Sequence, residues 1–353
     1  MEISDLQVDY SKEISKAVYS INAHYTELQN KTKILYFTYL QENRTVEEFS
    51  KEVEKIWGNI DHEFMDKQIS KLQELIHSDN VKIAVDIKRI DGVEYYEIGN
   101  QEWIINEEYF KLVPESEFNK YETKFMERVI KDYKKKRELL NNKTEMEKEY
   151  YLENLLNRYD ERINQVVAYY NKDGGIARYV QLSSYLSMLH NVDLTRSGWN
   201  QTLADSDYLG TNEFIIPYHP FSCEYCQMYQ NRPLSKEYVI NVLGLEAEEQ
   251  IGDILHPNCK CTLSILWDNS QIDMNTPNYM QEQENYQIRQ EVNGISLTRN
   301  KLEVDLQLAR KLGNEKMVDK IESKLYKLSN QEQQLINKLP SESLKKQVVA
   351  INR

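Results

Sequence analysis

The chain has 353 residues, enough for two or three modules, and its 25 tyrosines argue against a disordered polypeptide. A formal net charge of -13 opposes an extended footprint on DNA, because such binding neutralises phosphates with Lys and Arg, so at most weak or local DNA contact is expected. No apolar run approaches the roughly 18 residues that a membrane span requires, so we expect a soluble protein without membrane contact.

Residues 1–80 are predicted to form an N-terminal helical region, because apolar side chains recur at helical spacing and proline is absent. These apolar positions include Ile14, Val18, Ile21, Tyr25 and Leu28. From Val81 apolar and polar residues alternate, and Asp91-Gly92 stands between two alternating runs. Because Asp-Gly in that position is typical of a β-hairpin, we expect a small antiparallel β element at 81–113.

A second, long helical segment is predicted at 114–170, with Ser116 as its candidate N-cap and a break near Asn141-Asn142. It carries the basic run Lys131–Arg137, which is able to contact DNA or an acidic protein surface. The alternative that we favour is a solvated helix face whose charge is balanced by nearby glutamates. Those glutamates are Glu138, Glu145, Glu147 and Glu149.

A compact α+β module is predicted at 171–268, starting at the turn Asp173-Gly174-Gly175. Within it we expect helices at 183–191, 194–209 and about 235–243, a strand at 213–218 and a closing strand at 261–267. All four cysteines of the chain lie in this module, in the motifs Cys223-Glu-Tyr-Cys226 and His256-Pro-Asn-Cys259-Lys-Cys261.

These two motifs predict one structural zinc ion, because thiolates and imidazoles at such spacing can complete a tetrahedral site from two turns. Six groups compete for about four places: His219, Cys223, Cys226, His256, Cys259 and Cys261. The first residues, Met1–Leu6, show no secretory leader, so a disulfide is the weaker alternative. Idle buried cysteines and a redox pair are the others. No His-Glu-x-x-His or His-x-Glu motif is present, so we expect no catalytic metal.

After a polar linker at 269–278, a helical arm is predicted at 279–353, with a turn at Gly313-Asn314. Apolar residues from Val318 alternate at three and four, as in a coiled coil or a helical hairpin. They are Ile321, Leu325, Leu328, Leu335 and Leu339. Two interpretations stay open: the seam packs on its own domain, or it recruits another protein, including a second copy of the chain. The expected fold class is mainly α with a small β component: a helical N-terminal region with an inserted β-hairpin sheet, a zinc-stapled α+β module and a C-terminal helical or coiled-coil arm.

Several motifs in order resemble the phage minor capsid protein 2 family and the related phage Mu F-like head morphogenesis proteins. The resemblance covers about 170–353. Its motifs are Ser184-Tyr185-Leu-Ser-Met188, Thr195-Arg196-Ser-Gly-Trp199-Asn200, a hydrophobic strand into His219, Cys226 to Ser235, Asn258-Cys259-Lys260-Cys261 and the long charged helix from Gln283 to Gln347. Family members often carry His where this chain has Cys226 and Cys261, and Gly where it has His256. The resemblance therefore favours Cys226, Cys259 and Cys261 as ligands and leaves the fourth open among Cys223, His219 and His256.

This resemblance implies a structural minor capsid or head protein of a tailed bacteriophage, without enzymatic activity. Its implied partners are the portal protein and capsid or scaffold proteins, during head assembly, DNA packaging or ejection. The implied location is the virion, in the capsid interior or at the portal vertex, after assembly in the bacterial host cytoplasm. The alternative is an enzyme carried by a head protein. An ADP-ribosyltransferase-type site would use Arg178, Ser183-Ser184 and Glu246-Ala-Glu248, and a zinc-supported nuclease would use His256.

Overall fold

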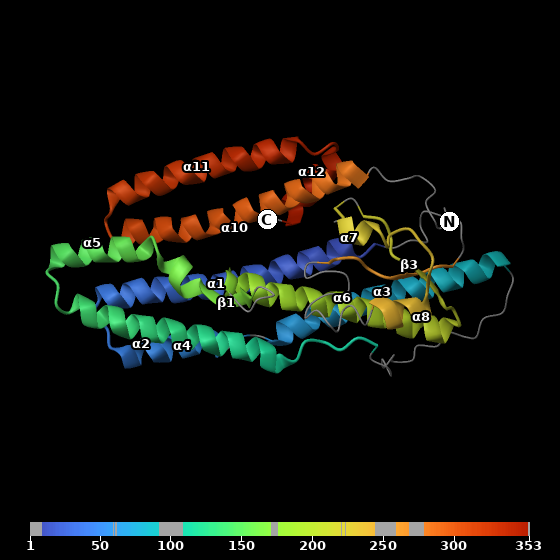
Figure 1. Cartoon of the computed structure of the whole chain (residues 1–353), viewed down its shortest axis with the longest axis horizontal. Helices are drawn as coiled ribbons and strands as arrows, with labels where there is room; N and C mark the ends of the chain where they lie inside the picture. The colour runs from blue at the N-terminus through green and yellow to red at the C-terminus, as the bar shows by residue number, and fades with distance from the viewer. Residues whose placement is uncertain are drawn as a thin grey trace. The chain divides into compact units, whose positions relative to one another are not determined.

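The protein is mainly helical with a small antiparallel β component, which confirms the predicted fold class (Figure 1). The structure is a computed structural model that describes residues 9–58, 60, 62–91, 109–170, 176–219, 221–222, 224–243, 259–267 and 279–351. The chain folds into two compact units, and neither unit is a continuous stretch of sequence. Unit 1 combines residues of 1–18, 62–113 and 188–287, and unit 2 combines residues of 19–61, 114–187 and 288–353.

The first half of the chain contains α1 (Ser11–Gln41), α2 (Val46–Trp57), α3 (His62–Asp91), α4 (Glu115–Leu140), α5 (Glu145–Leu156), the π-helical turn η2 (Asp160–Asn164) and the strands β1 (Gln165–Tyr170) and β2 (Ile176–Gln181). The second half contains α6 (Leu182–Leu209), β3 (Glu213–Ile215), α7 (Glu224–Gln227), β4 (Leu234–Ser235), α8 (Lys236–Tyr238), the π-helical turn η3 (Val239–Leu243), β5 (Ser264–Ile265), α10 (Tyr279–Lys311), α11 (Glu315–Asn337) and α12 (Glu342–Ile351). Sheet order is β4-β3-β5, and β1 pairs antiparallel with β2.

Helices α1, α2 and α3 confirm the helical N-terminal region, but the strand expected from Val81 is wrong. Helix α3 continues to Asp91, and residues 109–113 belong to no strand; 92–108 lie outside the described residues. The buried side chains Ile76, Asn80 and Ile83 recur at helical spacing, four and then three residues apart. Burial of that stripe outweighs the β-propensity of the alternating run, which is a weak preference by comparison.

The predicted segment at 114–170 is a pair of helices followed by a strand. The break at Asn141 is confirmed, because α4 ends at Leu140 and α5 begins at Glu145 behind a Thr144 capping box. Two details are wrong. Helix α4 begins directly after Pro114, so Ser116 is not its N-cap. The helix expected through Val166 is replaced by β1, whose β-branched and aromatic residues pair with β2.

Helix α6 is a single helix, so the two shorter helices predicted at 183–191 and 194–209 are wrong in that they are continuous. No glycine or proline interrupts residues 192–193, and the Asp193 carboxylate accepts a hydrogen bond of 2.7 Å from the Val113 N–H. The remaining module elements were expected in the correct places, since β3 lies within 213–218, α8 and η3 within 235–243, and β5 within 261–267.

The C-terminal residues form a helical hairpin, in which α10 and α11 run antiparallel to each other (Figure 1). Gly313 supplies the turn with φ of +67°, and the Asn314 side chain caps α11 by accepting from the Met317 N–H. Ion pairs join Arg310 to Glu322 and Arg299 to Glu332. The seam residues Ile321, Leu335 and Leu339 are buried, so part of the predicted seam packs within unit 2.

A buried ion network joins three separate segments of unit 2. The Lys33 side chain of α1 is 2% exposed, and its Nζ lies 2.8 Å from Asp160 Oδ2 and 2.6 Å from Asp305 Oδ1. Asn164 donates to the other Asp160 oxygen at 2.7 Å, and the Tyr159 ring faces the Lys33 ammonium. Burial opposes the charge of Lys33, but the two carboxylates outweigh burial and raise the pKa of Lys33.

Candidate metal centre

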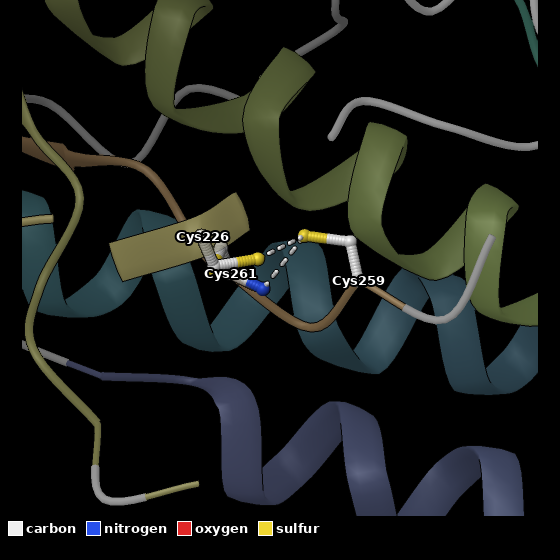
Figure 2. A group of neighbouring side chains, drawn as sticks. All are labelled: Cys226, Cys259 and Cys261. Atoms are coloured by element: carbon white, nitrogen blue, oxygen red, sulfur yellow. Dashed lines mark hydrogen bonds between the residues drawn. The ribbon is translucent and has the colours of Figure 1, made fainter. Parts of the chain in front are cut away.

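Three of the predicted ligands converge in the interior of unit 1 (Figure 2). Cys226 lies on the short helix α7, while Cys259 and Cys261 lie on the segment that leads into β5. All three are almost completely buried, and their sulfur atoms lie within 4.8 Å of one another. The Cys226 and Cys259 sulfurs are 3.6 Å apart, well beyond the roughly 2.05 Å of a disulfide bond. Three free thiols in one place form a group of the metal-binding type.

His219 is the fourth group that the structure brings to this cluster. Its Nε2 lies 3.4 Å from Cys261 Sγ, and the residue is 6% exposed. Around a tetrahedral zinc, ligand bonds of about 2.3 Å for sulfur and about 2.05 Å for nitrogen place two sulfurs about 3.75 Å apart and a sulfur and a nitrogen about 3.55 Å apart. The observed 3.6 Å between Cys226 and Cys259 and 3.4 Å between His219 and Cys261 are close to these edges.

The six predicted ligands therefore fall into three groups. Cys226, Cys259 and Cys261 are brought together, and His219 contacts Cys261. Cys223 and His256 lie outside the described residues. The three cysteines that the structure groups are those that the family resemblance favours.

Helix α6 fixes the cysteine-bearing segment through a row of buried side chains, which we call the α6 donor row: Asn191, Thr195, Trp199 and Thr202. Asn191 Nδ2 donates to the Cys259 carbonyl at 2.8 Å, and Thr195 Oγ1 lies 3.2 Å from the same oxygen. The Trp199 indole N–H donates to the Cys261 carbonyl at 2.9 Å, and Thr202 Oγ1 donates to the Leu263 carbonyl at 3.1 Å.

The donor row was not predicted, although its spacing follows one face of a helix. With α6 interpreted as two helices, its members did not share a face. In one continuous helix, they form a row parallel to residues 259–263 and satisfy carbonyls that burial would otherwise leave unpaired. The row positions Cys259 and Cys261 without contacting their sulfur atoms.

Polar groups also approach the sulfur atoms themselves. The Gln230 amide donates to Cys261 Sγ at 3.7 Å, and the Cys261 backbone N–H donates to Cys259 Sγ at 3.4 Å. Ser222 Oγ lies 2.8 Å from Gln230 Oε1 and 2.6 Å from the His219 carbonyl, so its single hydrogen links the two residues in turn. Donors aimed at sulfur favour the thiolate form, which is the form that binds metal.

The cluster is enclosed by apolar side chains. Trp199, Phe214, Leu263 and Ile265 are each at most 1% exposed and belong to the same hydrophobic core as the cysteines. A catalytic zinc site keeps an open coordination position that water or substrate can reach. Close packing around the described ligands suits a site that cross-links two chain segments, because it excludes water from those ligands.

Comparison of the chain with protein-family models, curated proteins and solved structures found no match in any of the three. The resemblance to phage head proteins therefore stays a prediction from the motifs. Among the described residues, no helix is sufficiently long and apolar to cross a membrane.

Proposed function

We propose that Cys226, Cys259 and Cys261 hold one structural zinc ion, with the fourth ligand supplied by His219, Cys223 or His256. Zinc favours closed, four-coordinate sites of thiolate and imidazole, and the interligand distances are close to tetrahedral edges. Such an ion ties α7 to the segment held by the α6 donor row. The β4-β3-β5 sheet is too small to stabilise this region by itself, so a metal cross-link contributes directly to its folding.

We further propose that the protein is a structural minor head protein of a tailed bacteriophage, associated with the portal protein and with capsid or scaffold proteins in the virion. The observation that carries this proposal is the ordered set of motifs from Ser184 to Cys261, together with the convergence of the cysteines that those motifs contain. A buried, enclosed ligand cluster supports a structural role over a catalytic one. The acidic net charge is compatible with a protein that lies beside packaged DNA without extensive adhesion.

No observation on the described residues favours the enzyme alternatives. An ADP-ribosyltransferase-type site would require Glu246 and Glu248, and a zinc-supported nuclease would require His256. These three residues lie outside the described residues.

The test uses the phage that encodes this chain. Mass spectrometry of purified particles should detect the protein, and deletion of its gene should reduce the yield of DNA-filled heads. Complementation with the wild-type gene should restore the yield, whereas complementation with Cys261→Ser should not. A protein that is missing from particles and dispensable for their formation contradicts the head-protein proposal. It leaves the metal proposal intact, because that depends on metal content.

A further inference from the structure

A basic hollow lies on unit 2, in the region of the basic run of α4. Its volume is about 400 Å³, and it is lined by Arg128, Lys131, Asp132, Lys135, Glu161, Arg162 and Ile163. The four α4 members occupy positions i, i+3, i+4 and i+7, so they share one helix face. Arg162 and Glu161 come from η2, a π-helical turn, and such turns are frequent at functional sites.

The two guanidinium groups of the hollow are held in place by protein contacts. Arg128 Nη1 donates to the Gln165 carbonyl at 2.7 Å. Arg162 Nη2 pairs with Asp132 at 2.5 Å, and the other Asp132 oxygen accepts from the Tyr36 hydroxyl at 2.7 Å. Burial and the Asp132 carboxylate raise the pKa of Tyr36, so its hydroxyl keeps the proton that it donates. Pre-organised guanidinium groups lose less entropy when they bind an anion.

The lysines of the hollow are exposed and have no acidic partner among the described residues. Lys131 and Lys135 make no ion pair there, and only Glu161 opposes them, since Asp132 is engaged by Arg162. Positive groups in the hollow therefore outnumber negative ones. At physiological salt the Debye length is about 8 Å, so the excess acidic charge elsewhere on the chain is largely screened from a ligand in the hollow.

The sequence-based expectation of a balanced helix face does not hold at these positions. Glu145 pairs with Lys148, and Glu147 caps α5 through Thr144. The basic run is itself divided, because the buried Lys136 ammonium faces the Tyr151 ring. The lysines that line the hollow are thus separated from the structural lysine between them and from two of the four glutamates that were expected to balance them.

We propose that this hollow binds phosphate groups, presented either by a nucleic-acid strand or by a free polyphosphate. Two fixed guanidinium groups match the oxygens of a phosphate, and two mobile ammonium groups at the rim add charge without fixed geometry. The site uses none of the metal-centre residues and does not rest on the head-protein proposal.

The experiment measures binding of a fluorescein-labelled DNA duplex by anisotropy between about 50 and 200 mM salt, and binding of tripolyphosphate by calorimetry. The test variant is Lys131→Gln with Lys135→Gln. The matched control is Lys124→Gln with Lys134→Gln, which removes the same charge from exposed positions of α4 outside the hollow. Circular dichroism confirms that both variants retain the wild-type helical content.

We expect the wild type to bind at least one of the two ligands, and the test variant to bind it about tenfold more weakly at low salt. For the duplex, the test variant should lower the slope of log affinity against log salt by about 2. The control should change affinity less than twofold. Duplex binding assigns the site to nucleic acid, and tripolyphosphate binding without duplex binding assigns it to free polyphosphates. No binding of either ligand, or equal losses in test and control variants, overturns the proposal.

Discussion

Replacing Lys33 by Met should strongly destabilise unit 2. The side chain is 2% exposed, and its ammonium lies within 2.8 Å of Asp160 and 2.6 Å of Asp305. Lys33→Met removes the cation and leaves two carboxylates whose side chains are 25% and 16% exposed. Loss of one partner of a buried ion network costs about 3–5 kcal/mol, because the remaining charge is desolvated and uncompensated.

Two further variants separate this cause from the loss of packing. Lys31→Met lies on the same helix and removes an ion pair with Glu27, in which both side chains are more than half exposed. An exposed pair contributes at most about 1 kcal/mol, so this control should be nearly silent. Lys33→Met combined with Asp160→Asn and Asp305→Asn removes all three charges, and it should recover much of the stability that Lys33→Met loses.

Urea unfolding followed by far-UV circular dichroism measures these differences. The reasoning is refuted if Lys33→Met costs no more than Lys31→Met, or if the triple variant is less stable than Lys33→Met. The pH dependence provides a second check. The pKa of Lys33 is raised, so its contribution is fully present below its unfolded pKa of about 10.4 and is lost as pH rises through the higher folded value. The difference between wild type and Lys33→Met should therefore stay constant from pH 7 to about pH 10.

Two further predictions concern unit 1. Trp199→Phe removes the indole donor to the buried Cys261 carbonyl and should cost about 1–3 kcal/mol in thermal or urea unfolding; an unchanged stability contradicts the positioning role of the α6 donor row. Burial raises the pKa of Glu282 although Tyr218 donates to it, so the native state binds more protons and loses stability as pH rises above the ordinary carboxyl pKa of about 4.3. Glu282→Gln should therefore melt at or above the wild-type temperature at pH 7 and lose this advantage below about pH 4; a lower melting temperature at pH 7 contradicts it.

Local patterns predicted most of the helical architecture. Helical spacing, the Asn141 break and the Gly313-Asn314 turn depend on residues that are close in sequence, and the structure confirms them. The strand expected at Val81 failed because a contact across the chain decides that segment. Asn80 of α3 donates to Asp205 at 2.8 Å, and its buried helical stripe packs in unit 1. Such tertiary contacts have no local signature.

The candidate site shows the same division. Thiolate spacing alone pointed to Cys226, Cys259 and Cys261, because ligand chemistry is visible in residue type and separation. The supporting side chains were not visible, since Trp199 and Gln230 reach Cys261 from elements that are 31 residues or more distant in sequence. Only the continuity of α6 aligns its donors with the cysteine segment.

The metal content of the purified protein tests the central claim most directly. Inductively coupled plasma mass spectrometry should find one zinc ion per chain in the wild type and a loss of that ion in Cys261→Ser. Lys31→Met, which leaves every candidate ligand in place, should retain the ion. Wild-type protein without stoichiometric metal, or Cys261→Ser protein with undiminished zinc, would contradict a metal centre built on these cysteines.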